Sequence, residues 1–259
     1  MTTSLTDDAI AEALVRFQVD GWAFVGNLCD AGTLEALRTR ADAIMLGEVT
    51  YDGLFFQHDA PSGDYDDLEY GKGYQGPSLE YRKVEKLEKD PLYWDWMRRE
   101  PFGRIATRVY GTPEVSLYRA FLMNKHAGGG SNLPWHQDGG SFWGLDRDPV
   151  LQIWTALDDA PLDGGCLEFV RGSHLRGLAT PLGGVVPDDK LRDMRSEDVT
   201  RVTAVAGDVI LIHNHVWHRS GRTFTGRPRR ALSVCYMDGA TQCRRKKRSP
   251  RTFVRVFGP

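Results

Sequence analysis

Cysteine is scarce in this chain, with four residues among 259, and no two of them form a C-x-x-C pair. That spacing excludes a zinc knuckle and a dithiol redox site, and unpaired thiols are typical of a reducing cytoplasm. Long apolar runs are also missing, since none reaches the roughly 20 residues that a membrane-spanning helix needs. The first residues lack the basic and apolar stretches of a secretion signal. We therefore expect a soluble, cytoplasmic protein with no membrane partner.

Neither sign of charge is in excess, because 33 Lys and Arg residues are balanced by 35 Asp and Glu residues. A protein that binds nucleic acid needs a basic field, so no nucleic-acid partner is expected. The basic run at 244–251 is interpreted as a solvated segment, with a patch that binds an anionic ligand as the alternative. A small-molecule substrate is the expected partner, and the sequence makes no prediction of the oligomeric state.

Two kinds of pattern follow one another along the chain without a linker between them. In residues 1–112, apolar side chains at helical spacing predict helices, with one short strand at 22–25. In residues 113–259, short apolar segments alternate with glycine-containing turns, which is typical of a β jelly roll or sandwich. The predicted helices cover 7–19, 32–46, 91–99 and 102–110, and the predicted strands cover 115–124, 133–140, 150–160, 166–170, 203–213, 217–221, 229–236 and 252–257. We expect a single β-rich (α+β) domain over 1–259, with helices packed outside a β core.

The segment Trp135-His136-Gln137-Asp138 carries the sharpest chemical signal. Residues i and i+2 of a strand point to the same face, so His136 and Asp138 can offer a nitrogen and a carboxylate oxygen to one ion. A third ligand from a distant strand would complete the two-histidine, one-carboxylate triad of non-haem Fe(II) oxygenases. Alone, the H-x-D pattern is weak, because it occurs often by chance.

A second cluster of histidines follows an apolar strand, and spacing alone leaves His213, His215 and His218 open as the third ligand. Arg229 stands eleven residues beyond His218, at the start of the next predicted strand. Its planar fork suits a carboxylate bound bidentately, as a 2-oxoacid co-substrate would require. His174, in a Gly-Ser-His turn, is interpreted as a structural residue.

Five stretches of the β region together resemble a known family. They are LMNK (122–125), LPWHQD (133–138), IWTALDDAPLDGGCLEFVRGSH (153–174), GDVILIHNHVWHRSG (207–221) and RRALSV (229–234). From about residue 83 to residue 237, the chain is similar to the phytanoyl-CoA dioxygenase family of Fe(II)- and 2-oxoglutarate-dependent oxygenases. The resemblance implies a double-stranded β-helix, a jelly-roll relative of the cupins, with N-terminal helices that buttress one sheet.

The resemblance also implies an enzyme that uses Fe(II), 2-oxoglutarate and O₂. Such an enzyme hydroxylates, or otherwise oxidises, an unactivated C–H bond of a small organic metabolite and releases succinate and CO₂. A carboxylate at Asp138 favours hydroxylation, because related halogenases have a small residue there, while desaturation and ring formation use the same ligands. The family's usual P-G-S-H turn is Arg171-Gly-Ser-His174 here, which is a change of turn only.

The family resemblance also implies roles for individual residues of this chain. The resemblance makes His136, Asp138 and His218 the iron ligands and the catalytic centre. Arg229, with Ser220, would bind the distal carboxylate of 2-oxoglutarate. The neighbouring Arg230 leaves this assignment open by one position. The other residues expected beside the co-substrate are Trp154, Lys83 and Phe121.

Substrate recognition is expected in two aromatic-rich segments, 50–78 and 139–148. The first has no sustained periodicity, so it is predicted to be a long loop, either a functional lid or a plain surface loop. The residues expected to contact the substrate are Phe55, Phe56, Phe142 and Trp143.

Three other classes of protein remain open. A cupin-like metal-dependent hydrolase or isomerase would use the triad but would not need Arg229 or Ser220. A non-catalytic jelly-roll binding module would use the histidines structurally and would hold no metal. A transcriptional or sensory protein would need a surface for nucleic acid or a partner, at which only the basic run 244–251 hints. Turnover of 2-oxoglutarate to succinate separates the oxygenase from all three.

Overall fold

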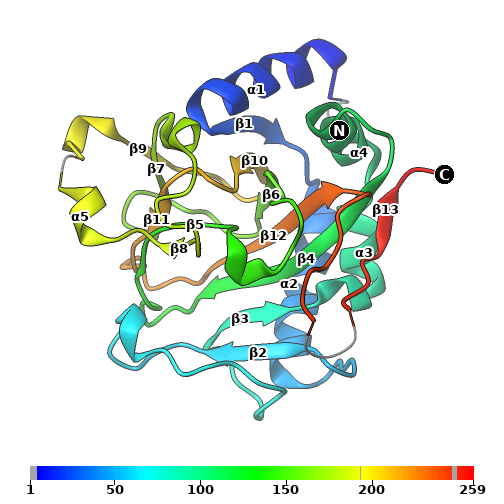
Figure 1. Cartoon of the computed structure of the whole chain (residues 1–259). Helices are drawn as coiled ribbons and strands as arrows, with labels where there is room; N and C mark the ends of the chain where they lie inside the picture. Colours follow the sequence, from blue (N-terminus) through cyan, green and yellow to red (C-terminus); the bar gives the residue numbers. More distant parts are fainter. Residues whose placement is uncertain (1–4, 193, 247–249) are drawn as a thin grey trace.

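Two antiparallel sheets face each other in the computed structural model, which describes residues 5–192, 194–246 and 250–259 (Figure 1). The strands are β1 (Trp22–Asn27), β2 (Phe55–His58), β3 (Tyr81–Glu85), β4 (Val115–Lys125), β5 (Leu133–Gln137), β6 (Leu151–Ala156), β7 (Leu167–Val170), β8 (Gly184–Val185), β9 (Val199–Val202), β10 (Asp208–His213), β11 (His218–Ser220), β12 (Arg229–Asp238) and β13 (Arg255–Phe257). The larger sheet has the order β1-β10-β6-β12-β4-β3-β2, with β13 paired to β4, and the smaller sheet has the order β8-β5-β11-β7-β9. The predicted jelly roll is confirmed.

The central strands of the larger sheet divide their side chains between its two faces. Ile153 of β6 and Leu211 of β10 lie in a buried cluster that includes residues of the helices. Their neighbours Trp154 and Ile210 lie in a second cluster, together with Phe169 of the smaller sheet. Because successive residues of a strand point to opposite faces, one strand supports two layers of core.

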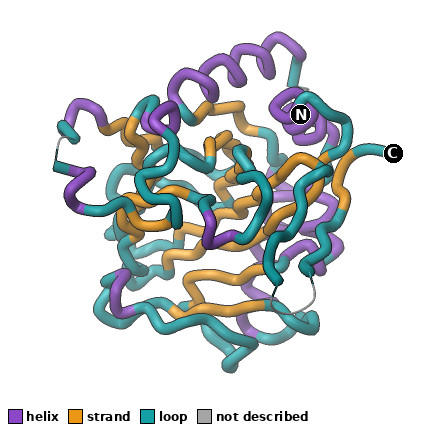
Figure 2. The backbone as a smooth tube through the Cα atoms, in the orientation of Figure 1, coloured by secondary structure: helices purple, strands orange, loops and turns teal. Residues whose placement is uncertain are grey.

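Helices cover the outer face of the larger sheet, as Figure 2 shows in purple around the orange strands. They are α1 (Asp7–Asp20), α2 (Ala31–Leu46), α3 (Pro91–Met97) and α4 (Glu100–Tyr110), and a short α5 (Asp188–Leu191) lies elsewhere in the chain. The Thr6 side chain accepts a hydrogen bond from the amide of Ala9 and so begins α1. Gly21, with a φ of +86°, ends the same helix in the left-handed conformation. The predicted buttressing helices are confirmed.

The N-terminal part is less helical than the sequence predicts. Strands β1, β2 and β3 all come from it and join the larger sheet. The prediction of a continuous loop over 50–78 is therefore wrong, because β2 lies within it and pairs with β3. A strand of four residues is too short to show an alternating pattern, which is why the sequence conceals it. The predicted strand at 203–213 is shorter, since β10 begins at Asp208.

The sequence also bears on membrane-spanning helices and on the basic run 244–251. No helix among the described residues is both long enough and apolar enough to cross a bilayer. Part of the basic run, 247–249, lies outside the described residues.

The two adjacent arginines at the start of β12 point to opposite faces of the sheet. Arg229 lines the cavity between the sheets. Arg230 turns toward the helices, where its guanidinium lies 2.8 Å from Asp158 and 2.6 Å from Asp42 of α2. The alternation of the strand therefore settles which arginine faces the histidines.

Arg230→Ala is expected to lower the free energy of unfolding by about 1–3 kcal/mol, because it removes the charged hydrogen bonds to Asp158 and Asp42, although Arg38 remains 3.2 Å from Asp158. Arg16→Ala is the matched control, since Arg16 makes an exposed ion pair within α1, and should cost less than about 0.5 kcal/mol. Urea-induced unfolding of the metal-free proteins measures both. An equal, small effect of the two changes would show that the Arg230 ion pairs do not hold α2 to the sheet.

Candidate active site

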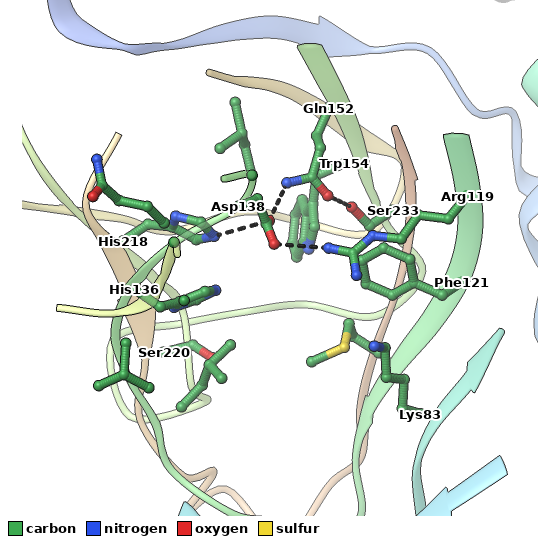
Figure 3. Close-up of a pocket in the computed structure, with 18 of the residues that line it drawn as sticks. Lys83, Arg119, Phe121, His136, Asp138, Gln152, Trp154, His218, Ser220 and Ser233 are labelled. Atoms are coloured by element: carbon green, nitrogen blue, oxygen red, sulfur yellow. Dashed lines mark hydrogen bonds and ion pairs between the residues drawn. The ribbon is translucent and has the colours of Figure 1, made fainter. Parts of the chain in front are cut away.

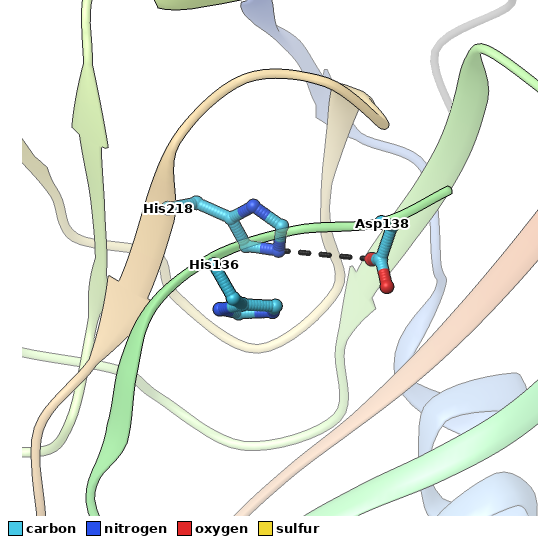
Figure 4. Close-up of side chains that lie close together, drawn as sticks. All are labelled: His136, Asp138 and His218. Carbon is cyan, nitrogen blue, oxygen red and sulfur yellow. Dashed lines mark ion pairs between the residues drawn. The ribbon is translucent and has the colours of Figure 1, made fainter. Parts of the chain in front are cut away.

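The two histidines of the predicted triad lie opposite each other on paired strands. His136 of β5 pairs with His218 of β11, and their ring centroids are 4.0 Å apart. Asp138 follows β5 by one residue, and its Oδ2 lies 3.8 Å from Nε2 of His218 (Figure 4). One ligand atom from each of the three residues lies within 4.8 Å of the others. The structure thus brings together the three residues that the sequence predicts as ligands.

Backbone carbonyl groups fix which nitrogen of each ring is free. Nδ1 of His136 lies 2.9 Å from the carbonyl oxygen of Pro134, and Nδ1 of His218 lies 3.0 Å from that of Val216. A carbonyl oxygen can only accept, so each Nδ1 carries the proton and each Nε2 keeps its lone pair. Burial, with His218 nearby, lowers the pKa of His136 to about 3, so the ring is neutral. Two neutral imidazoles and a carboxylate fit Fe(II) as a facial set of ligands.

Two side chains of the larger sheet, Arg119 and Gln152, hold the carboxylate of Asp138 (Figure 3). Nη2 of Arg119 donates to its Oδ1 over 2.7 Å, and the amide of Gln152 donates to its Oδ2. Ser233 in turn donates to Oε1 of Gln152 over 2.9 Å. Burial alone would raise the pKa of Asp138, but Arg119 and the two histidines outweigh it and lower this pKa below the usual range. The carboxylate is therefore ionised and oriented.

These supporting residues are missing from the sequence-based prediction. Arg119 and Gln152 each lie within an otherwise mostly apolar strand, β4 and β6. A buried charge or amide in such a strand needs a partner, so this exception to the pattern is a signal that could have found them. Ser233 carries no such signal, because a serine fits any strand.

A cavity of about 340 Å³ opens beside the triad. The five residues predicted to contact the co-substrate, Arg229, Ser220, Trp154, Lys83 and Phe121, all line it. Phe142 and Trp143 line it as well, whereas Phe55 lines a neighbouring cavity. The placement of Phe56 at a substrate site is wrong: this side chain is 3 % exposed and packs on Tyr74 and Tyr81 in the core. The alternation of β2 turns Phe56 inward.

Three other histidines, His174, His213 and His215, lie apart from the triad. Nε2 of His215 lies 3.2 Å from Oδ2 of Asp148, and Nε2 of His174 lies 2.9 Å from the carbonyl oxygen of Gln18. The His213 ring lies tilted against that of His174, with centroids 4.6 Å apart. None of these three histidines lines the cavity, so the turn between β10 and β11 decides which histidine joins the triad.

Buried positive charge gathers at one end of the site without a matching acid. Arg229 is 2 % exposed, its Nε has no hydrogen-bond partner, and it makes no ion pair with a described carboxylate. Burial lowers the pKa of Arg229 to about 10. Lys125 lies opposite Arg229 on β4 and does not line the cavity; burial and the charge of Arg229 hold the pKa of Lys125 well below its usual range. The unpaired guanidinium of Arg229 would be stabilised by an anion that enters the cavity.

Facing antiparallel sheets that hold two histidines and a carboxylate at one cavity are typical of mononuclear non-haem iron oxygenases. The family model described as phytanoyl-CoA dioxygenase matches residues 17–231. The chain therefore belongs to the phytanoyl-CoA dioxygenase family. The predicted family is confirmed.

Relatives and solved structures agree with this placement. A phytanoyl-CoA dioxygenase of Arabidopsis thaliana is 29 % identical over 170 residues, which are 63 % of this chain and 59 % of the relative. The structure of AviO1 from Streptomyces viridochromogenes is 26 % identical, with a TM-score of 0.63 over 92 % of this chain and 98 % of that one. The epimerase SnoN, in complex with Fe3+ and alpha ketoglutarate, shares the fold at 18 % identity and a TM-score of 0.70, over 97 % of this chain and 100 % of that one. The chain spans 46 to 59 % of the length of the first curated relatives that it matches.

His218→Ala is expected to weaken metal binding by more than about 100-fold, because a direct ligand matters more than the residues that support it. His215→Ala is the matched control from the same turn and should bind the metal as the wild type does, since His215 contacts Asp148 instead. Anaerobic calorimetric titration with Fe(II) measures both affinities. The reverse result, with loss in His215→Ala alone, would refute the choice of the third ligand.

Lowering the pH is expected to destabilise the metal-free protein. The pKa values of His136 and His213 are lowered by burial to about 3, whereas an unfolded histidine takes up its proton near pH 6.5. Between these values the unfolded chain binds protons that the folded chain does not. The free energy of unfolding therefore falls as the pH is lowered, by up to about 1.4 kcal/mol per pH unit for each histidine.

Urea-induced unfolding between pH 7 and pH 5 measures this effect, in a range where most unfolded carboxyl groups stay ionised. The His213→Gln variant should show a smaller slope of stability against pH. A stability that does not change between pH 7 and pH 5 would contradict the neutral, buried histidines.

Proposed function

We propose that this chain is an Fe(II)- and 2-oxoglutarate-dependent oxygenase that hydroxylates a C–H bond of a small organic metabolite and releases succinate and CO₂. One observation carries the proposal: the triad shares its cavity with Arg229, a buried arginine that has no acidic partner among the described residues. A hydrolase or isomerase needs the triad but has no use for a buried, unpaired arginine beside it.

The chain's own residues divide the work. His136, Asp138 and His218 would hold the iron, which when bound supplies the reaction with O₂ that no side chain can perform. Arg119 and Gln152 keep the carboxylate of Asp138 ionised and in place through their two hydrogen bonds. Because Asp138 already provides the third protein ligand, hydroxylation is proposed in preference to halogenation.

The co-substrate would be bound by residues of the facing sheets. Arg229 of β12 and Ser220 of β11 offer a guanidinium and a hydroxyl group to its distal carboxylate. Trp154 and Phe121 border the same cavity and would pack on its methylene groups. Lys83 is already paired with Glu85, so its contact would be made by a neutralised group.

The whole chain is proposed to act as one domain in the cytoplasm. Strands β1, β2 and β3 of the N-terminal part lie in the same sheet as β4, β6, β10 and β12, which supports a single domain over 1–259. All four cysteines are free thiols, which suits a reducing compartment.

Anaerobic titration with 2-oxoglutarate tests the proposal, because the chelate formed on Fe(II) gives a weak visible charge-transfer band. The wild type should show this band, and the His136→Ala variant should not. Succinate formed under air measures turnover. Iron without the band would favour a cupin-like hydrolase or isomerase, and absence of iron would favour a binding module.

Arg229→Gln is expected to weaken binding of 2-oxoglutarate by at least about 30-fold, since a buried charge pair is worth 2 kcal/mol or more. Binding of 2-oxopentanoate, which lacks the distal carboxylate, should change much less. Arg227→Gln is the matched control, because Arg227 is exposed two residues away and does not line the cavity. Equal losses for both acids would place the distal carboxylate elsewhere.

A further inference from the structure

A second, larger cavity adjoins the one beside the triad. Its volume is about 830 Å³. The residues that line both cavities are Tyr65, Lys83, Arg119, Phe142 and Trp143. Two spaces with this much common wall give a ligand room to reach from one into the other, so we call the second space the antechamber.

Flat aromatic side chains line the antechamber. Trp143 stacks on Tyr118 with ring centroids 4.2 Å apart and an angle of 14° between the planes. Phe142 is 68 % exposed and Tyr70 is 88 % exposed, and Tyr70 meets Phe55 edge to face. Aromatic side chains grouped at the mouth of a cavity favour a ligand with a ring or another flat apolar part.

The antechamber also contains two arginines, Arg251 and Arg245, that form no ion pair among the described residues. Arg251 lies over the rings of Tyr118 and Phe253, at 4.8 and 5.1 Å from their centroids, and donates to the backbone of Tyr118. Arg245 donates to the carbonyl oxygen of Phe142. Neither arginine makes an ion pair with a carboxylate in the described part of the chain, whereas Arg119 is paired with Asp138.

Basic side chains that line the antechamber outnumber its two acidic residues, Glu85 and Glu88. Glu85 is paired with Lys83. Glu88 is partly buried, and burial raises the pKa of its carboxyl group while Arg251 lowers it. The stacked guanidinium of Arg251 is therefore the group best placed to meet an anion, because its orientation is already fixed by the two rings.

We propose that the antechamber binds the part of the substrate that is not oxidised, and that this part joins an acidic group, held by Arg251 and Arg245, to a ring system that packs on Trp143 and Phe142. The proposal deepens the oxygenase function proposed above and rests on it, because the bound molecule is a substrate only if the protein is that oxygenase. It assigns the substrate to the class of ring-containing organic anions, with the oxidised carbon directed past Arg119 toward the triad.

A pair of fluorescent dyes tests the two halves of this proposal on the metal-free, full-length protein. The dye 1-anilinonaphthalene-8-sulfonate combines two ring systems with an anion, and N-phenyl-1-naphthylamine has the same rings without it. The wild type should bind the sulfonate more tightly. Arg251→Gln should weaken sulfonate binding by about tenfold, the loss of one contact of about 1.4 kcal/mol, and leave the neutral dye within about twofold.

Two further variants make the result specific. Arg255→Gln is the matched control, because Arg255 lies in the same segment but does not line the antechamber, and it should change neither dye's affinity. Phe142→Ala should weaken both dyes, since it removes ring contact and no charge. Thermal unfolding of each variant confirms that it is folded.

The outcomes separate this proposal from the oxygenase function. An affinity for the sulfonate that is equal in the wild type and Arg251→Gln would overturn the anion site. An affinity for both dyes that is unchanged in Phe142→Ala would overturn the ring site. Either failure leaves the charge-transfer band untouched, because the dye test uses no iron. Loss of that band with the dye discrimination intact would instead refute the oxygenase and keep the antechamber as a site for ring-containing anions.

Discussion

The pairing of β5 with β11 is the interaction on which the site depends. Each strand contributes one histidine at the same level, so the sheet's own hydrogen bonds set the separation of His136 and His218. Asp138 then follows β5 by one residue and meets both rings. A shift of either strand by one residue would turn its histidine away, so the register of this strand pair determines the geometry of the metal ligands.

The facing sheet adds the groups that the triad itself lacks. Arg119, Gln152 and Arg229 come from three strands of the larger sheet, β4, β6 and β12, and all line the cavity. Ala120, Ile153 and Arg230, each next to one of these residues, face the helices instead. The alternation of each strand thus lets the fold bury apolar surface on one side while it holds charged and amide groups on the other.

How much the sequence could predict follows from how local each feature is. His136 and Asp138 share one strand, so their spacing predicts their common face. The choice of His218 over its neighbours depends on where β10 ends and β11 begins, which packing decides and spacing alone cannot show. Phe56 was assigned to the substrate because aromatic composition does not reveal which face of β2 points inward.

The order of the strands has a consequence for synthesis on the ribosome. Strand β1 lies at the edge of the larger sheet and pairs only with β10, with Trp22 opposite Ile212. At 5–20 residues per second, the partner emerges roughly 10–40 s after β1 does. Until then the backbone of β1 lacks its pairing partner. Contacts this distant slow folding, so the nascent chain passes through a long stage in which chaperones have access to its unpaired edge.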